Sequence, residues 1–456
     1  MEGIATDFYA DGRIKGKYNY LNDLLDGTAV YYDSATQFIT RTGKYVGDQG
    51  TGEWKYYYNE SNNLKSIITI QQNKRNGEAW YYDSASHMIL KTIAFLNDRQ
   101  EGEACEYFIG TDKLKADEFY TNDQFDGRTI FYDSLSGKIV QIAYYVAGKR
   151  QGLCTSYFIG TDRVLSTVNF INDLPEGKII YFDSLSGKPE HYTFYNKGKM
   201  DGPCTYLFNT GQIRLIMPYK NGYLDGTTSQ FDPLTGKLLV VGHYTLGEAD
   251  SIWTIYYAGT NIVKATATFK NKKNGEARYY DSVTRLLTSY GDYIDDSKDG
   301  EWVTYFAGTD VPKSSLNYKN DTLNGWANYF DSVSHNLKST GTYVNGEKDG
   351  KWTFYAIGHV TSTEVYKNNG TEFDATNFDD KGNMVSVGAY LNGNKTGKWK
   401  FYTQGVLTAE KNFLLGELDG ESIEYFPKTK ARIKETYAKG KLISMQKFDS
   451  SGNEIH

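Results

Sequence analysis

Residues 127–151 read GRTIFYDSLSGKIVQIAYYVAGKRQ, and this stretch decides the fold because the chain repeats its pattern from end to end. The stretch opens with a glycine, and over the N-terminal half another glycine follows every twenty-five residues. A fixed period of this length is the signature of a repeat architecture. These glycines, called anchors below, are Gly27, Gly52, Gly77, Gly102, Gly127, Gly152, Gly177 and Gly202, then Gly226, Gly275, Gly300, Gly325, Gly350, Gly397 and Gly420.

The anchors predict one repeat array over residues 1–456, which leaves no room for a separate catalytic domain. About nineteen units result if weaker copies open at both ends. The pattern is best kept over 20–360, and we expect degenerate repeats over 1–19 and 361–456. The units without an anchor glycine open at Ser251, Phe373 and Ser444, and the first unit opens at Gly3.

Two aromatic positions and a turn define the structure of each unit. An aromatic residue lies five positions after most anchors and another lies seven positions before the next, as Tyr132 and Tyr145 do in the quoted stretch. The segment DSLSGK between them supplies the Asp and Gly that close a hairpin. The predicted elements of this unit are strands over 128–132 and 138–145, a turn through Gly137, and a loop over 146–151.

The predicted fold is therefore all-β, an elongated single-sheet solenoid of tandem antiparallel β-hairpins. Tyr, Phe, Thr, Val and Ile favour a pleated surface, and no apolar stripe of helical period is sustained. We expect the aromatic residue at position five to face position twelve, as Tyr132 would face Ile139, and each such pair contributes roughly 0.2–1 kcal/mol. Units with a Tyr-Asp-Ser turn alternate with units that have Gly-Thr-Asp, so hairpins pair into modules of about fifty residues.

Two stretches of the chain resemble the MORN repeat, in the bacterial variant found in YwqK-family antitoxins. They are YVNGEKDGKWTFY at 343–355 and YLNGNKTGKWKFY at 390–402. The resemblance covers nearly the whole chain, although the turn here is longer than in that repeat. It implies an extended, twisted sheet of hairpins. For function it implies scaffolding, protein binding and, in some members, lipid binding, and the family name implies toxin neutralisation.

Composition limits the class of partner. The formal charge is −6 and the pI is near 5.7. Nucleic acids and anionic membranes both require a basic surface, so we expect no nucleic-acid partner and consider membrane binding unlikely. No run of about twenty apolar residues is present, as a membrane-spanning helix would need.

The compartment stays open between two alternatives. Met1 leads directly into the first expected hairpin, which fits either a native cytoplasmic start or a processed protein of the cell surface or exterior. Cys105, Cys154 and Cys204 lie in units two apart, roughly 19 Å from one another by strand spacing, so no disulfide can join them. Free cysteines favour the cytoplasm.

No motif for catalysis or for cofactor binding is present. The six histidines are scattered, and His87 and His335 occupy the turn position that Gly137 fills. Metal-ligand pairs, nucleophile elbows and phosphate-binding glycine loops are missing from the sequence. We therefore expect a protein that is not an enzyme and that holds no cofactor.

Two rows of acidic turn residues are the candidates for metal binding. Carboxylates in loops are the ligands that calcium prefers. The alternative is that Asp and Asn are simply what tight turns require. The weak calcium candidates are Asp33, Asp83, Asp133, Asp183, Asp281 and Asp331, and a second row consists of Asp23, Asp98, Asp123, Asp173 and Asp321, each after an Asn.

The aromatic rows are the candidates for an interaction surface. A single sheet without helices leaves aromatic surface accessible, and such surface usually marks a binding site. We favour a protein partner, of unknown identity, over a glycan. The candidate residues are Trp54, Tyr57, Tyr82, Tyr107, Tyr132, Tyr157, Trp253, Trp302, Trp352 and Trp399.

The expected function is a non-enzymatic scaffold for protein–protein interaction, through aromatic sheet faces and acidic turn edges. One alternative is an antitoxin-like protein that neutralises a partner toxin. The other is a surface filament, because unpaired terminal strands allow copies to join end to end in an open assembly.

Overall fold

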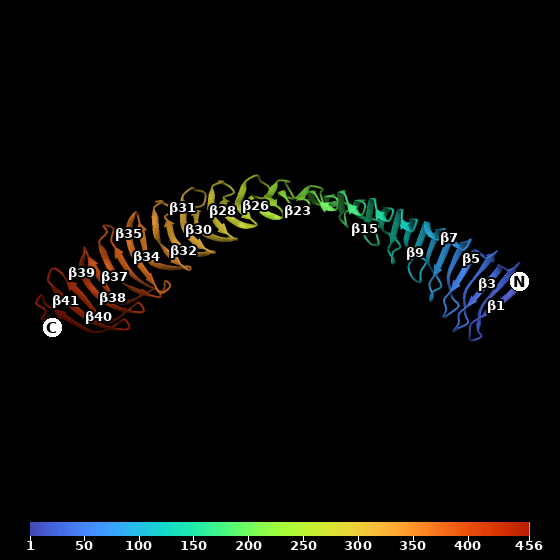
Figure 1. The fold of residues 1–456 in the computed structure, drawn as a ribbon. Coiled ribbons are helices and arrows are strands. Elements are labelled where there is room, and N and C mark those ends of the chain that lie inside the picture. Colours follow the sequence, from blue (N-terminus) through green and yellow to red (C-terminus); the bar gives the residue numbers. More distant parts are fainter. Residues whose placement is uncertain (456) are drawn as a thin grey trace. The chain divides into compact units, whose positions relative to one another are not determined.

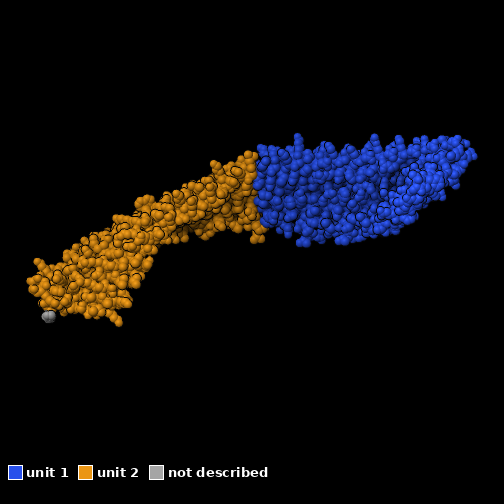
Figure 2. Space-filling model, turned by 60° about the horizontal axis from the view of Figure 1, so that its bottom comes forward, with its two compact units in different colours: residues 1–225 blue, residues 226–456 orange. Residues whose placement is uncertain are grey.

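The computed structural model describes residues 1–455 and is all-β. It contains one open antiparallel sheet of 43 strands, and residues 1–455 include no helix. Consecutive strands are joined as hairpins, and Figure 1 shows them following one another in chain order. The structure divides into two compact units, residues 1–225 and 226–456 (Figure 2). Each unit is a run of the same hairpins and is described by itself.

The strands of the first unit are β1 Gly3–Phe8, β2 Ile14–Leu21, β3 Leu24–Tyr32, β4 Ile39–Val46, β5 Gln49–Tyr57, β6 Leu64–Gln71, β7 Lys74–Tyr82, β8 Ile89–Leu96, β9 Arg99–Tyr107, β10 Leu114–Thr121, β11 Gln124–Phe125, β12 Gly127–Tyr132, β13 Ile139–Val146, β14 Lys149–Arg150, β15 Gly152–Tyr157, β16 Val164–Ile171, β17 Leu174–Pro175, β18 Gly177–Phe182, β19 Pro189–Asn196, β20 Lys199–Met200, β21 Gly202–Leu207, β22 Ile213–Lys220 and β23 Tyr223–Leu224.

The strands of the second unit are β24 Gly226–Phe231, β25 Leu238–Thr245, β26 Glu248–Tyr256, β27 Val263–Lys270, β28 Lys272–Tyr280, β29 Leu287–Ile294, β30 Ser297–Tyr305, β31 Pro312–Lys319, β32 Thr322–Phe330, β33 Leu337–Val344, β34 Glu347–Ala356, β35 His359–Lys367, β36 Glu372–Phe378, β37 Met384–Leu391, β38 Asn394–Thr403, β39 Val406–Leu414, β40 Glu417–Phe426, β41 Ala431–Ala438, β42 Lys441–Phe448 and β43 Glu454–Ile455.

Two kinds of turn alternate along the chain and form two edges. In the repeat that begins at Gly127, the longer turn DSLSGK joins β12 to β13, close to its predicted position. The turns at this place in each repeat form the turn edge. The predicted loop over 146–151 is wrong. Val146 pairs with Lys149, so only Ala147 and Gly148 form the turn, both with positive φ (47° and 78°). Two-residue turns of this kind suit twisted hairpins. They form the junction edge.

The anchor glycines lie at β-bulges. Gly127 has a φ of 118°, and the preceding residue, Asp126, donates its N–H to Phe119 O at 2.9 Å. An extra residue with positive φ in one strand is the usual geometry of a bulge. Ser251 keeps this conformation without glycine, with a φ of 62°. Phe373 does not, and β35 and β36 pair there without any register shift. The anchor glycine therefore marks the position of a bulge, and the bulge is missing where Phe373 stands in place of the glycine.

The predicted cross-strand register is confirmed. Tyr132 pairs with Ile139, and the same pairing of positions five and twelve recurs in the repeats with the longer turn; where the turn is shorter, Tyr355 pairs with Val360 and Tyr402 with Leu407. Further examples are Tyr57 with Leu64, Tyr82 with Ile89, Tyr280 with Leu287 and Phe330 with Leu337. Hairpins also continue through 1–19 and 361–455, which lie in the terminal ranges where the sequence pattern is degenerate.

The core lies on one face of the sheet, where a regular row of residues is buried together with residues of the return strands such as Ile93, Ala143 and Phe170. The residue two positions after each anchor is buried, and side chains alternate along a strand, so the residue directly after the anchor lies on the opposite face. We call these the aromatic face and the outer face. The buried row, called the core row, consists of Ala29, Trp54, Ala79, Ala104, Thr129, Cys154, Ile179 and Cys204 in the first unit, and of Thr228, Ala277, Trp302, Ala327, Trp352, Ala375, Trp399 and Ser422 in the second.

Candidate interaction surfaces

The tryptophans proposed as interaction residues lie in the interior. Trp54, Trp302, Trp352 and Trp399 are 3 %, 3 %, 1 % and 0 % exposed, and Trp253 is half-buried. Each ring lies over a glycine eleven residues earlier, so closely that a Cβ there would overlap the ring. The prediction of an accessible tryptophan row is therefore wrong. The five pairs are Gly43 with Trp54, Gly242 with Trp253, Gly291 with Trp302, Gly341 with Trp352, and Gly388 with Trp399.

A tyrosine ring packs edge-on against each buried indole, and a lysine lies over Trp302, Trp352 and Trp399. Around Trp352, Tyr343 packs edge-on at 5.1 Å between ring centroids, and the indole N–H donates to Thr342 O at 3.0 Å. Lys348 Nζ lies 4.5 Å from the indole and 4.8 Å from Tyr366, and burial lowers the pKa of this lysine. Cation–π contact of this kind is favourable when desolvated. Lys298 over Trp302 and Lys395 over Trp399 repeat the arrangement.

A buried carboxylate cluster on the aromatic face was not predicted. Glu118 is 5 % exposed and accepts a hydrogen bond from the Tyr120 hydroxyl at 3.0 Å. Lys91 Nζ lies 3.7 Å from Glu118 and 3.3 Å from Glu106. Burial raises the pKa of the Glu118 carboxyl. None of these contacts involves a nucleophile. Lys91 and the Tyr120 hydroxyl are the polar partners of the buried Glu118 carboxyl, so we interpret the cluster as structural. The signal in the sequence is Glu-x-Tyr, which recurs at 364–366 and 435–437 with the same bond.

The five tyrosines proposed as interaction residues are half-buried. Tyr57, Tyr82, Tyr107, Tyr132 and Tyr157 lie at strand ends next to the turn edge, where each pairs with an aliphatic residue. Burial raises the pKa of the phenols of Tyr82, Tyr107 and Tyr132. Part of each ring therefore packs within its own hairpin, and only the remainder is accessible.

The outer face of the first unit carries apolar side chains that the sequence analysis missed. Phe119, Tyr144 and Leu153 are 40 %, 44 % and 52 % exposed. Ile142 pairs with Thr155, so Tyr144 and Leu153, two residues further along each strand, lie side by side. In the second unit Trp326 is 65 % exposed on this face. The signal was the residue directly after the anchor, which is Glu at 53, 78 and 103 but Leu at 153 and Trp at 326.

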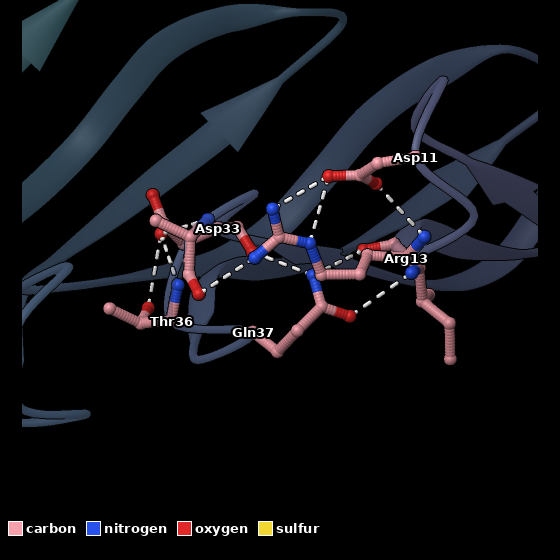
Figure 3. Close-up of polar contacts among 7 residues, drawn as sticks. Asp11, Arg13, Asp33, Thr36 and Gln37 are labelled. Carbon is pink, nitrogen blue, oxygen red and sulfur yellow. Dashed lines mark hydrogen bonds and ion pairs between the residues drawn. The ribbon is translucent and has the colours of Figure 1, made fainter.

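The first acidic row is occupied by bonds within its own turns. Asp133 Oδ2 accepts hydrogen bonds from the N–H and the hydroxyl of Ser136, both at 2.7 Å, and these bonds lower the pKa of the carboxyl. Figure 3 shows the equivalent turn, where Asp33 Oδ1 accepts from Thr36 and Gln37 reaches the neighbouring hairpin. Among residues 1–455, no three His, Cys, Asp or Glu side chains are grouped to hold a metal ion. The weak calcium candidates each accept a backbone N–H of their own turn, which is the tight-turn chemistry given as the alternative; they are Asp33, Asp83, Asp133, Asp183, Asp281 and Asp331.

The second acidic row joins neighbouring hairpins. Asp98 donates its N–H to Arg75 O at 2.9 Å, and its Oδ1 accepts the N–H of Arg75 at 2.9 Å. A two-point bond to the residue twenty-three positions earlier closes the junction edge between successive hairpins. The same pair of bonds joins Asp48 to Leu25, Asp123 to Gln100, Asp173 to Arg150, Asp296 to Lys273 and Asp321 to Lys298.

Two histidines lie in turns and the three cysteines lie in strands. His87 and His335 adopt φ values of 62° and 61° in the turn position where Gly137 has 71°, as predicted. Cys105, Cys154 and Cys204 lie in strands as free thiols, and burial raises the pKa of each.

No protein-family model matches the chain, and no curated protein resembles it in sequence. The resemblance to the MORN repeat therefore stays a prediction that rests on the quoted residues. Within the part of the chain described, no helix has the length and apolar character needed to span a bilayer.

Proposed function

We propose that the chain is a non-enzymatic scaffold that binds a partner protein through the outer face of its sheet. The observation that carries the proposal is the exposed pair Tyr144 and Leu153, which lie side by side on that face. Phe119 lies in the same row one strand further on, with Arg128 between it and Tyr144. Contiguous exposed apolar groups on a sheet surface usually mark a site of interaction.

The composition around this pair has the arrangement of a protein interface. Arg128 is cross-strand partner to Tyr144 and is exposed, and Lys178 is exposed in the same row further along. A core of aromatic and aliphatic groups with a charged rim is typical of protein–protein contacts. The aromatic face is less suited to this role, because Trp54, Trp302, Trp352 and Trp399 are buried beneath neighbouring side chains.

Neutralisation of a toxin is one form of this proposal, because an antitoxin also acts by binding one protein. The MORN-like resemblance is the reason to include it. It differs from general scaffolding in requiring a complex of fixed stoichiometry with a single protein. End-to-end association through β1 and β42 is a separate proposal that stays a prediction.

Site-specific photocrosslinking in the native cell tests the proposal. The crosslinking amino acid p-benzoylphenylalanine is placed at Tyr144 and, as a control, at Lys44, which is exposed at the same position of another repeat. We expect one discrete crosslinked protein from position 144, missing at 44 and lost when Leu153→Asp is added. Equal labelling at both positions, or none at 144, would contradict the proposal.

A further inference from the structure

The most exposed hydrophobic side chains of the chain lie in one kind of place. Among residues 1–455, nine large hydrophobic side chains are at least 75 % exposed, and eight of them belong to turns of the turn edge. Hydrophobic side chains scattered singly over a surface need no explanation, but a regular row does. The eight are Ile109 at 76 %, Leu135 at 87 %, Ile159 at 75 %, Leu185 at 84 %, Leu234 at 89 %, Val283 at 84 %, Val333 at 87 % and Ile357 at 90 %; the ninth is Ile4 at 77 %.

The fold does not use these side chains. The backbone of two of the turns is held by a basic residue of the preceding hairpin: Lys113 Nζ donates to Leu135 O at 2.7 Å, and Arg163 Nη1 donates to Leu185 O at 3.2 Å. Both bonds involve the main-chain carbonyl, so any residue at the turn tip could accept them. The aliphatic identity of the tips has no explanation within the chain, while the bonds hold the tips in fixed positions.

In the first unit four successive turns carry such a tip. They join β9 to β10, β12 to β13, β15 to β16, and β18 to β19, and Figure 1 shows these hairpins in sequence along one part of the sheet. Two strand spacings separate neighbouring tips, which corresponds to roughly 9.6 Å. We call this row, Ile109, Leu135, Ile159 and Leu185, the comb.

We propose that the comb is a lateral dimer contact, in which the comb of a second copy of this chain interdigitates with it. If an aliphatic side chain of the second comb lies midway between two neighbouring side chains of the first, it is roughly 4.8 Å from each. This is close to the distance at which aliphatic side chains make contact. A two-fold axis satisfies this arrangement, because it places each comb against the same surface of its partner.

Other occupants fit the comb less well. An α-helix repeats its face every seven residues, or about 10.5 Å, and falls out of step with the comb by roughly 3 Å over three intervals. An anionic membrane would need free basic groups. Lys113 and Arg163 are bonded to turn carbonyls, and Lys138 is paired with Asp162 at 2.8 Å. The identical period of a second copy is the best match.

This inference is independent of the proposed function, because the comb lies on the turn edge and the proposed partner site on the outer face. Sedimentation velocity of the full chain over a hundredfold concentration range tests it directly. The wild type should pass from a monomer of 51.6 kDa to a saturable dimer of twice that mass. The variant L135S/L185S should dissociate at least about tenfold more readily, since each buried leucine contributes strongly to association.

Two further variants separate the comb from general surface hydrophobicity. V146S/L246S removes aliphatic residues that are 56 % and 69 % exposed on the junction edge and should dimerise as the wild type does. L135M/L185M keeps apolar side chains in the comb and should also retain the dimer. A monomer at every concentration, a dimer unaffected by L135S/L185S, or flotation of the wild type with phosphatidylcholine vesicles while it stays monomeric would each overturn the inference.

Discussion

Replacing Gly341 by alanine tests whether the glycine–tryptophan pairs hold the sheet together. The backbone at this glycine is not in the left-handed region, so the substitution introduces no backbone strain. Its effect is steric, because the new Cβ would overlap the ring of Trp352. That ring is 1 % exposed and is fixed by the bond from its N–H to Thr342 O and by Tyr343 and Lys348. These contacts oppose displacement of the Trp352 ring.

The expected loss of stability is about 2 kcal/mol. Overpacking of a filled site costs about 1–3 kcal/mol. Displacement of the ring also weakens the indole hydrogen bond, a loss of about 1 kcal/mol. Alanine is better than glycine in a strand by about 0.5–1 kcal/mol, which offsets part of this cost. The steric cost is the largest of these contributions, so the substitution should lower the stability of the sheet. Local opening of the strands around Gly341 should become roughly thirtyfold more frequent.

Hydrogen exchange measured by mass spectrometry reads this effect locally, which matters because long repeat arrays need not unfold in one step. Peptides from β33 and β34 should exchange faster in G341A, while β4 and β5 in the first unit serve as the internal control. The double variant G341A/W352L should lose less than the sum of the two single variants, because the smaller side chain leaves space for the methyl group. Unchanged exchange in β33 and β34, or strict additivity, would refute the reasoning.

Three further predictions concern the junction edge, the buried carboxylate and the thiols. D98A should speed exchange of the Arg75 amide, because Asp98 Oδ1 accepts that N–H at 2.9 Å, and unaltered protection would contradict the two-point bond. Burial raises the pKa of Glu118, so its contribution to stability is complete below the ordinary glutamate pKa of about 4.3 and is lost as pH rises through the folded value. E118Q should therefore flatten the decline in thermal stability from acid to neutral pH; a slope equal to that of the wild type would count against it. Cys154 is 5 % exposed, so iodoacetamide should label it more slowly than half-buried Cys105 in the native chain, as peptide mass spectrometry would measure, and equal rates would be inconsistent with this structure.

The sequence predicted the hairpin and its register because both follow from local chemistry. The DSLSGK turn fixes how many residues separate Tyr132 from Ile139, and their pairing follows. The loop over 146–151 was wrong because Lys149 and Arg150 are polar and resemble loop residues, whereas they pair with the preceding strand at the edge of the sheet. The turn also requires a positive φ at Ala147, and alanine is not a residue type that indicates this conformation in a sequence.

The misassigned sites have a common physical cause. Trp352 was assigned to the surface because a single sheet seemed unable to bury an indole, but Gly341 lets the ring lie flat on the neighbouring strand. The turn carboxylates suggested calcium because residue type alone does not show that their oxygens are already bonded. The glycine eleven positions before each core-row tryptophan was available in the sequence and would have indicated burial.

The two-point aspartate bond gives the chain a direction. Asp98 completes the edge of the hairpin before it, so each hairpin acquires its last main-chain partners only when the following hairpin is in place. The N-terminal part of a chain emerges from the ribosome first. The main-chain bonds of a repeat are therefore completed only after the following repeat has been synthesised. At the junctions that carry this bond, the amide of the earlier hairpin stays open until the aspartate twenty-three residues later has been synthesised.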